Sequence, residues 1–157
     1  YTEVAGHGMS SDAMDITLPD AGGAARAIAG ALKNAKLNPE DVDYVNAHGT
    51  GTAANDVTET RALKQVFGDN ASSLPISSTK SMIGHALGGA GALELAAVVL
   101  GMCDGIARPT VNYVERDPEC DLDYIPNEPR EMEINAAISN SFAFGGLNAV
   151  MALKKLS

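Results

Sequence analysis

The sequence predicts an α/β fold in which helices pack against a mixed five-stranded sheet. Short apolar strands alternate along residues 1–103 with segments whose apolar residues recur at helical spacing. This alternation is typical of parallel or mixed sheets covered by helices. Two more strand patterns then follow one another at residues 135–142 and 148–155, separated only by a bend containing Ala-Phe-Gly-Gly. So short a connection makes this last pair antiparallel.

Turn residues and periodicity give the individual elements. The predicted strands are 1–8, 42–47, 74–78, 135–142 and 148–155, with a short edge strand at 122–125. The predicted helices are 23–36, 55–67 and 90–103. Asn38-Pro39 closes the first helix and Gly68 is the expected C-cap of the second. Residues 10–23 are predicted as a loop, and residues 108–113 as extended chain.

Composition and net charge exclude several classes of function. A chain of 157 residues with 45% apolar content suits one domain with a real core. Its net charge of −9 disfavours general nucleic-acid binding, which needs a basic surface. Its longest apolar run, 95–102, is too short to span a bilayer, so no membrane partner is expected. Cys103 and Cys120 stand outside any CxxC pattern, which favours reduced thiols and a cytoplasmic location.

Three loops that follow predicted strands contain the candidate chemistry: 47–54, 78–89 and 140–146. Sites in open α/β sheets gather at the carboxyl ends of strands. Two of these loops carry a histidine flanked by glycine, His48 and His85. A single histidine is most often structural, and His7, in the first strand, is interpreted so. Two histidines in strand-end loops favour a reaction centre.

Two charged residues near the second loop need partners. Lys80 is either a solvated charge, the partner of a neighbouring acid, or a cation that keeps an imidazole neutral. A neutral imidazole can donate a hydrogen bond to a developing oxyanion. Glu94 is the only charge in an apolar helical run, and a buried carboxylate needs a partner. It either hydrogen-bonds locally, braces a loop or binds a structural cation.

Other patterns in the same loops are weaker. Ser77-Ser78-Thr79-Lys80 matches the Ser-x-x-Lys pattern of serine acyl-enzymes but has no downstream partner motif. Gly88–Gly91 lacks the full dinucleotide-binding pattern. A zinc site built from His48, Asp56, Glu59 and His85 is disfavoured, because no H-E-x-x-H spacing is present.

Together the motifs NAHGTGT (46–52), STKSMIGHALGGAGALE (78–94) and NSFAFGG (140–146) resemble beta-ketoacyl-acyl carrier protein synthases. These are elongating condensing enzymes of the thiolase-like superfamily. YTEVAGHG (1–8) and CDLDYIP (120–126) are similar to the bacterial type II form. The resemblance implies that residues 1–157 are the C-terminal domain, one half of an α-β-α-β-α layered fold. Ala143 departs from the pattern, which more often has glycine there.

The resemblance implies a reaction and assigns residues to it. Malonyl-acyl carrier protein loses carbon dioxide, and the enolate attacks an acyl group carried on a cysteine. His48 and His85 would stabilise the enolate oxygen, and Lys80 would hold the network around His85. Thr50 and Thr52 would bind the phosphopantetheine arm of the carrier protein, and no other cofactor is expected. Phe144 would gate the nucleophile and contribute an oxyanion-hole N–H, while Gly145 and Gly146 let its loop move. Asn46, Glu94, Ser139 and Asn140 are structural, and some relatives hold a cation there, although no catalytic metal is expected.

The nucleophile of this family lies in an N-terminal domain that this chain does not contain, and neither Cys103 nor Cys120 stands in a matching motif. The isolated chain is therefore predicted to be inactive. The predicted partners are its own N-terminal half, a second copy in a homodimer and the acyl carrier protein. Because carrier proteins are acidic, a local basic patch is needed, with Arg26, Lys33, Lys36 and Arg108 as candidates. A non-catalytic chain-length or scaffold subunit and a polyketide ketosynthase region remain alternatives.

Overall fold

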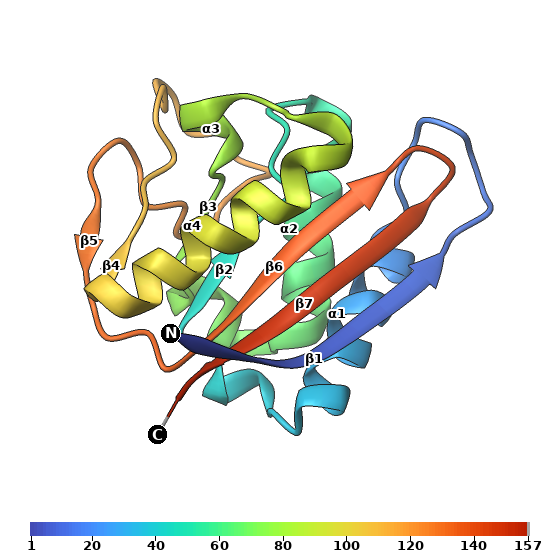
Figure 1. Cartoon of the computed structure of the whole chain (residues 1–157). Helices are drawn as coiled ribbons and strands as arrows, with labels where there is room; N and C mark the ends of the chain where they lie inside the picture. The colour runs from blue at the N-terminus through green and yellow to red at the C-terminus, as the bar shows by residue number, and fades with distance from the viewer. Residues whose placement is uncertain (157) are drawn as a thin grey trace.

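The computed structural model describes residues 1–156 and contains the predicted mixed five-stranded sheet (Figure 1). Its strand order is β1-β7-β6-β2-β3. The strands are β1 (Thr2–Ser11), β2 (Tyr44–Asn46), β3 (Ile76–Ser77), β6 (Ala136–Ala143) and β7 (Leu147–Lys155). A separate two-stranded sheet joins β4 (Ile106–Ala107) to β5 (Arg130–Glu131). The α/β prediction and the closing antiparallel pair are confirmed.

Helices cover both faces of the sheet. They are α1 (Ala21–Ala35), α2 (Ala53–Phe67), the short α3 (Lys80–Ile83) and α4 (Ala90–Asp104). In Figure 1, α4 crosses one face while α1 and α2 lie behind the other. Ile28 and Leu63 belong to one hydrophobic core, which lies between α1, α2 and the sheet. Val98 and Met102 of α4 belong to a second hydrophobic core, which lies between α4 and the sheet.

The pairing pattern decides where the site can form. β2 runs parallel to both β3 and β6, whereas β6, β7 and β1 pair antiparallel. The carboxyl ends of β2, β3 and β6 therefore meet at one edge of the sheet. The three candidate loops leave the sheet at that edge, as expected for a binding site in an open α/β sheet.

Several boundaries differ from the sequence prediction. Residues 9–11 continue β1, because they pair with residues 147–149 of β7. Helix α1 starts at Ala21 rather than Gly23, since the Asp20 side chain caps it by accepting the Gly23 N–H. The predicted strand at 122–125 is wrong: Asp123 forms only an isolated bridge with Pro75. β4 and β5 were not predicted, because two-residue strands carry no periodicity.

Two glycines of β1 allow α1 to lie unusually close to the sheet. A Cβ atom on Gly6 would lie 2.5 Å from the backbone nitrogen of Ala35, and one on Gly8 would overlap the backbone of Ala27. Neither separation is compatible with a side chain. The small residues of α1 and β1 therefore set the spacing between this helix and the sheet.

Candidate active site

The loops after β2 and β3 bring the two predicted histidines together. His48 follows β2, and His85 lies two residues beyond the end of α3. Their ring centroids are 5.6 Å apart and the ring planes are nearly perpendicular, at 85°. His48 also lies 5.6 Å from the ring of Phe142 on β6. All three strand ends that meet at the edge therefore contribute to one cluster.

The buried carboxylate of Glu59 holds the loop that carries His48. Glu59 on α2 accepts the backbone N–H groups of His48 and Gly49, each at 2.9 Å. It also accepts a 3.0 Å hydrogen bond from the Asn140 side chain of β6. Burial raises the pKa of Glu59, and these three donors oppose the rise. Glu59 thus ties the loop after β2 to α2 and to β6.

The surroundings of His48 keep its imidazole neutral. Burial lowers the pKa of His48 from 6.5 to about 3, with further lowering by the charge of Lys80 and by His85. Its Nδ1 atom has no hydrogen-bond partner among the described residues. A ring that stays uncharged at neutral pH can donate one N–H, as stabilisation of an oxyanion requires.

His85 is exposed, and a local hydrogen bond sets its tautomer. Its Nδ1 accepts the backbone N–H of Leu87 at 3.2 Å. The neutral ring therefore carries its proton on Nε2. This atom is a second hydrogen-bond donor beside His48.

Lys80 and Glu94 form a buried ion pair under the histidines. The Nζ to Oε1 distance is 2.5 Å, and the side chains are 4% and 1% exposed. Lys80 neutralises Glu94, and its charge also lowers the pKa of His48. Both of the roles considered for the lysine, partner of an acid and tuner of an imidazole, are present. Glu94 braces the loop after β3 against α4.

At the group Asn46, Glu94, Ser139 and Asn140, where some relatives hold a cation, Asn46 hydrogen-bonds to its neighbours. The Asn46 amide donates to Ser139 Oγ at 3.1 Å and to Glu94 Oε2 at 3.4 Å, and Asn46 Oδ1 accepts the Thr79 hydroxyl. Asn140 Oδ1, in the same group, is buried and has no hydrogen-bond partner among the described residues. Among residues 1–156, no three His, Cys, Asp or Glu side chains are grouped closely enough to hold a metal.

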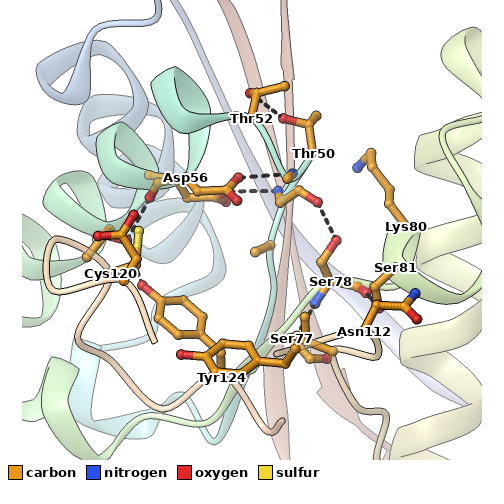
Figure 2. A pocket seen from close by; sticks show the side chains of 18 of the residues that line it. Thr50, Thr52, Asp56, Ser77, Ser78, Lys80, Ser81, Asn112, Cys120 and Tyr124 are labelled. Atoms are coloured by element: carbon orange, nitrogen blue, oxygen red, sulfur yellow. Dashed lines mark hydrogen bonds between the residues drawn. The ribbon is translucent and has the colours of Figure 1, made fainter. Parts of the chain in front are cut away.

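A cavity of about 730 Å³ opens beside His85 and Lys80 (Figure 2). Thr50 and Thr52, bonded through their hydroxyls at 2.9 Å, lie at its upper rim in the figure. Lys80 lies on one side, and Cys120 and Tyr124 lie across from it. His85 also lines the cavity. The two predicted threonines therefore line the same cavity as His85.

Ser78 joins the two histidine-bearing loops. Its hydroxyl donates to the carbonyl of Gly49 at 2.6 Å, and its own carbonyl accepts from the backbone and hydroxyl of Ser81 in α3. Gly49 has φ of +41°, and a Cβ there would lie 2.5 Å from the Ser78 Cβ. Only glycine fits this contact without strain.

Phe144 is at the tip of the β6–β7 connection and is 78% exposed. Gly145 and Gly146 adopt positive φ of 77° and 72° to make the bend. The bend is pinned at two points: Gly145 N–H donates to the carbonyl of Ile16, and Asp12 N–H donates to the carbonyl of Gly146, both at 2.8 Å. The aromatic ring that contacts His48 is Phe142, two residues earlier.

Sequence reasoning missed Glu59 as an organiser of the loop, Ser78 as a link and Phe142 as the ring beside His48. Glu59 had been weighed only as a zinc ligand. One signal was available for it: it follows His48 by eleven residues on a helix, with Asn55 four residues before it on the same face. No local signal marks Ser78, because its partner Gly49 lies on another strand end.

Helix α4 has an apolar face without a partner among the described residues. Leu93 and Leu100 are 50% and 51% exposed. By length and composition alone, Leu87–Asp104 would be long and apolar enough to cross a membrane. Its other side carries Glu94, paired with Lys80, and packs on β6. Helix α4 therefore packs on the sheet with one side and exposes the leucines of its other side.

Sequence comparison identifies close relatives. Residues 1–114 match the model of the "Beta-ketoacyl synthase, C-terminal domain" family. Nodulation protein E of Rhizobium meliloti is 55% identical over 98% of this chain and 38% of its own length. The 3-oxoacyl-[acyl-carrier-protein] synthase 2 of Synechocystis is 53% identical over 99% of this chain and 38% of its own. The chain thus spans less than half the length of these relatives.

Solved structures agree with the sequence matches. A type II polyketide ketosynthase, described in complex with its acyl-carrier protein, superimposes with a TM-score of 0.97 at 41% identity, covering 100% of this chain and 39% of that one. A beta-ketoacyl synthase from Burkholderia phymatum gives 0.94 at 42% identity over 99% and 38%. The fold, the motifs and the family match agree: the chain belongs to the beta-ketoacyl synthases and carries their C-terminal domain.

Proposed function

We propose that this chain is the decarboxylating part of a 3-oxoacyl-[acyl carrier protein] synthase of fatty acid elongation, acting within a longer cytoplasmic protein. The meeting of His48 and His85 at the sheet edge carries the proposal. One ring is held neutral by its surroundings, and the other presents its Nε2 proton. Both are hydrogen-bond donors suited to a negatively charged oxygen.

The chemistry follows from these two donors. When a malonyl thioester loses carbon dioxide, the bond to the carboxylate breaks and its electron pair enters the enolate. Negative charge builds on the thioester oxygen, where the two imidazole N–H groups stabilise it without transferring a full proton. The enolate carbon then attacks the carbonyl of an acyl thioester, and the cysteine thiolate leaves. The product is a 3-oxoacyl thioester two carbons longer.

The acyl-carrying cysteine must come from outside this chain. Burial raises the pKa of the Cys120 thiol, and the acidic side chains of Asp117, Asp56 and Glu119 raise it further. A protonated thiol is a poor nucleophile. Cys103 lies near the far end of α4 from Glu94 and is exposed. We therefore expect the chain alone to condense nothing.

The unpartnered face of α4 supports an N-terminal half as the missing structure. Half-exposed Leu93 and Leu100 lie on a helix whose opposite side fits the sheet. The relatives have more than half of their length outside the matched region. An apolar helix face of this kind is stabilised by burial against another layer. Such a layer would place a nucleophile near His48, and a second copy would complete the homodimer.

The cavity beside Thr50 and Thr52 supports an acyl carrier protein as the substrate carrier. Its phosphopantetheine arm is long and polar, and two threonine hydroxyls at the rim offer donors and acceptors along such an arm. One solved relative is described as a ketosynthase with its acyl-carrier protein. No other cofactor enters the proposed reaction.

A chimera tests the proposal. Residues 1–157 are joined to the N-terminal part of the Synechocystis synthase, which is 53% identical over the matched region. This chimeric synthase should form an acyl-enzyme, decarboxylate malonyl-carrier protein and release a 3-oxoacyl product. His48→Ala and His85→Ala should retain acylation but lose decarboxylation by at least about a hundredfold each. The native Synechocystis enzyme is the positive control.

A folded chimera that acylates but never decarboxylates would overturn the proposal. It would favour the second candidate, a non-catalytic subunit that only binds partners. The intact set of His48, His85 and Lys80 favours the catalytic function, because a scaffold has no use for two adjacent imidazoles, one of them kept neutral by burial and by the charge of Lys80.

A further inference from the structure

The outer edge of β3 is covered by irregular chain rather than by another strand. β3 pairs only with β2 among the described strands. On its free side, the Ile76 N–H donates to the backbone carbonyl of Asp123 at 2.8 Å. Two residues later, the N–H of buried Ser78 donates to the hydroxyl of Thr110 at 3.1 Å. A buried N–H needs an acceptor, so this side chain takes the place of a neighbouring strand.

Ser78 is also bonded to the loop that carries His48. Its hydroxyl donates to the carbonyl of Gly49 at 2.6 Å. Gly49 directly follows His48 in the chain. The residue that Thr110 holds by its N–H therefore holds the His48 loop by its side chain.

The carbonyl of Ser78 restrains the other part of the site. It accepts the backbone N–H of Ser81 at 3.1 Å and the Ser81 hydroxyl at 2.7 Å. Lys80 directly precedes Ser81, and His85 follows it by four residues. The position of Ser78 therefore affects both segments that bear the proposed catalytic groups.

A second hydrogen bond joins the Thr110 segment to α3. The N–H of Val111 donates to Ser81 Oγ at 2.9 Å. Together with the bonds of Ser78 to Thr110 and to Ser81, it completes a closed circuit of three hydrogen bonds. Figure 2 shows Ser78 and Ser81 on the same wall of the cavity. The start of α3 is thus fixed to residues 110–111 at two points.

The backbone around Thr110 is strained and firmly held. Its N–H donates to the Ile125 carbonyl at 2.9 Å, and its carbonyl accepts the Asn127 N–H at 2.8 Å. Asn127 has φ of +62°, and Ile125, which is 2% exposed in the core beneath α4, has φ of +45°. A β-branched residue rarely adopts this left-handed conformation. Such strain persists only where the surroundings impose it, and it is concentrated near functional sites.

We propose that Thr110 is a positioning residue for decarboxylation. Its hydroxyl holds Ser78, and through Ser78 it sets the relative placement of His48 and the segment that carries Lys80 and His85. The proposal rests on the proposed function, since it assumes that the two imidazoles stabilise one enolate oxygen. Two donors serve one oxygen only if both remain within hydrogen-bond distance of it. The hydrogen bonds of Thr110 go to Ser78 and to residues 125–127, so its effect on the reaction is indirect.

The test uses the chimeric synthase with Thr110→Val, which keeps the branched shape and removes the acceptor oxygen. Thr110→Ser keeps the hydroxyl and is the rescue variant. The matched control is Thr60→Val, which removes a buried hydroxyl bonded to Tyr124 and to the Asp56 carbonyl. Ser81→Ala breaks the second link and replaces Thr110→Val in the test if that variant does not fold.

Four quantities are measured for each variant. They are kcat and KM for decarboxylation of malonyl-carrier protein, the rate of acylation of the cysteine, the urea midpoint of unfolding, and amide hydrogen exchange in residues 47–52 and 78–85. A purely structural residue would change the unfolding midpoint without a selective loss of decarboxylation. Hydrogen exchange reports directly on the order of the two segments.

Thr110→Val should lower kcat by about tenfold or more, because displacement of reacting groups by about 1 Å can cost a hundredfold in rate. KM and acylation should stay within about twofold, and exchange should become faster in both segments. Thr110→Ser should restore most of kcat. Ser81→Ala should show the same pattern with a smaller loss of kcat.

The proposal is overturned if Thr110→Val resembles Thr60→Val in kcat and in exchange of the two segments, or if Thr110→Ser does not restore kcat. It is also overturned if Ser81→Ala, used in place of an unfolded Thr110→Val, changes neither quantity. A wild-type chimera that acylates but does not decarboxylate would instead refute the proposed function. The exchange data would then still decide whether Thr110 holds the two segments.

Discussion

The imidazole rings of His48 and His85 meet edge to face, with centroids 5.6 Å apart. They come from loops after two different parallel strands, 37 positions apart in the chain. Glu59 holds the first loop through two backbone N–H groups, and Ser78 joins it to the segment that carries the second. The geometry of the pair therefore depends on residues that hold the two loops through their backbone groups.

His48 should stay neutral well below the usual range of histidine. Its folded-state pKa is lowered to about 3, against 6.5 in the unfolded chain. Between these values the unfolded state binds more protons, so the contribution of His48 to stability is complete above pH 6.5 and is lost as the pH falls towards 3. NMR titration of labelled histidine should show a neutral His48 ring at pH 5. A His48→Gln variant should have a flatter stability profile between pH 6.5 and 4. A His48 signal that titrates near pH 6.5 would contradict the buried geometry.

Replacing Glu59 should disturb His48 without touching its ring. Glu59→Gln keeps the shape but turns one acceptor oxygen into an N–H donor that faces a backbone N–H. An unsatisfied buried donor costs about 1–3 kcal/mol, so we expect that loss of unfolding free energy and a lower rate of malonyl decarboxylation. Asp56→Asn is the control, since Asp56 accepts from Gly51 rather than His48. If Glu59→Gln acted no more strongly than this control on decarboxylation, Glu59 would not position the loop.

The Lys80–Glu94 pair should be far more sensitive to single changes than to joint replacement. Lys80→Ala leaves a carboxylate that is 1% exposed without its counter-charge, and such losses cost about 3–5 kcal/mol. Replacing both residues together, as Lys80→Met with Glu94→Leu, should restore most of the stability. Urea unfolding of the chimeric synthase measures both. Lys155→Ala, which breaks an exposed pair with Glu133, should cost no more than about 1 kcal/mol. A Lys80→Ala effect as small as this would mean that the pair is not buried in solution.

The contact between Gly49 and Ser78 should show as a double-mutant coupling. Gly49→Ala places a methyl group against the Ser78 Cβ, on a backbone with φ of +41°. We expect a loss of about 2–4 kcal/mol from the overlap and the left-handed backbone together. Adding Ser78→Gly removes the overlapping carbon and should recover part of that loss. Additive effects of the two substitutions, measured by unfolding, would show that they do not touch.

Patterns that are local in the chain were enough to predict the order of the elements and the candidate chemistry of the loops. The sequence patterns of α1, α2, α4 and the closing pair β6–β7 were clear, because each of these elements spans eight or more residues. The histidines, Thr50, Thr52 and the Phe144 loop were marked by motifs that are local in the chain. The prediction of a strand at 122–125 was wrong, because a four-residue pattern does not reveal whether the edge strand of a sheet is available for pairing.

Tertiary structure alone decided which groups act on one another. Glu59 and Asn140 are 81 positions apart, and only the parallel pairing of β2 with β6 brings their side chains to 3.0 Å. The sequence left three roles open for Lys80. Burial excludes the solvated charge, and Lys80 both pairs with Glu94 and lowers the pKa of His48. Desolvation and pairing depend on distances across the fold, and local sequence does not contain those distances.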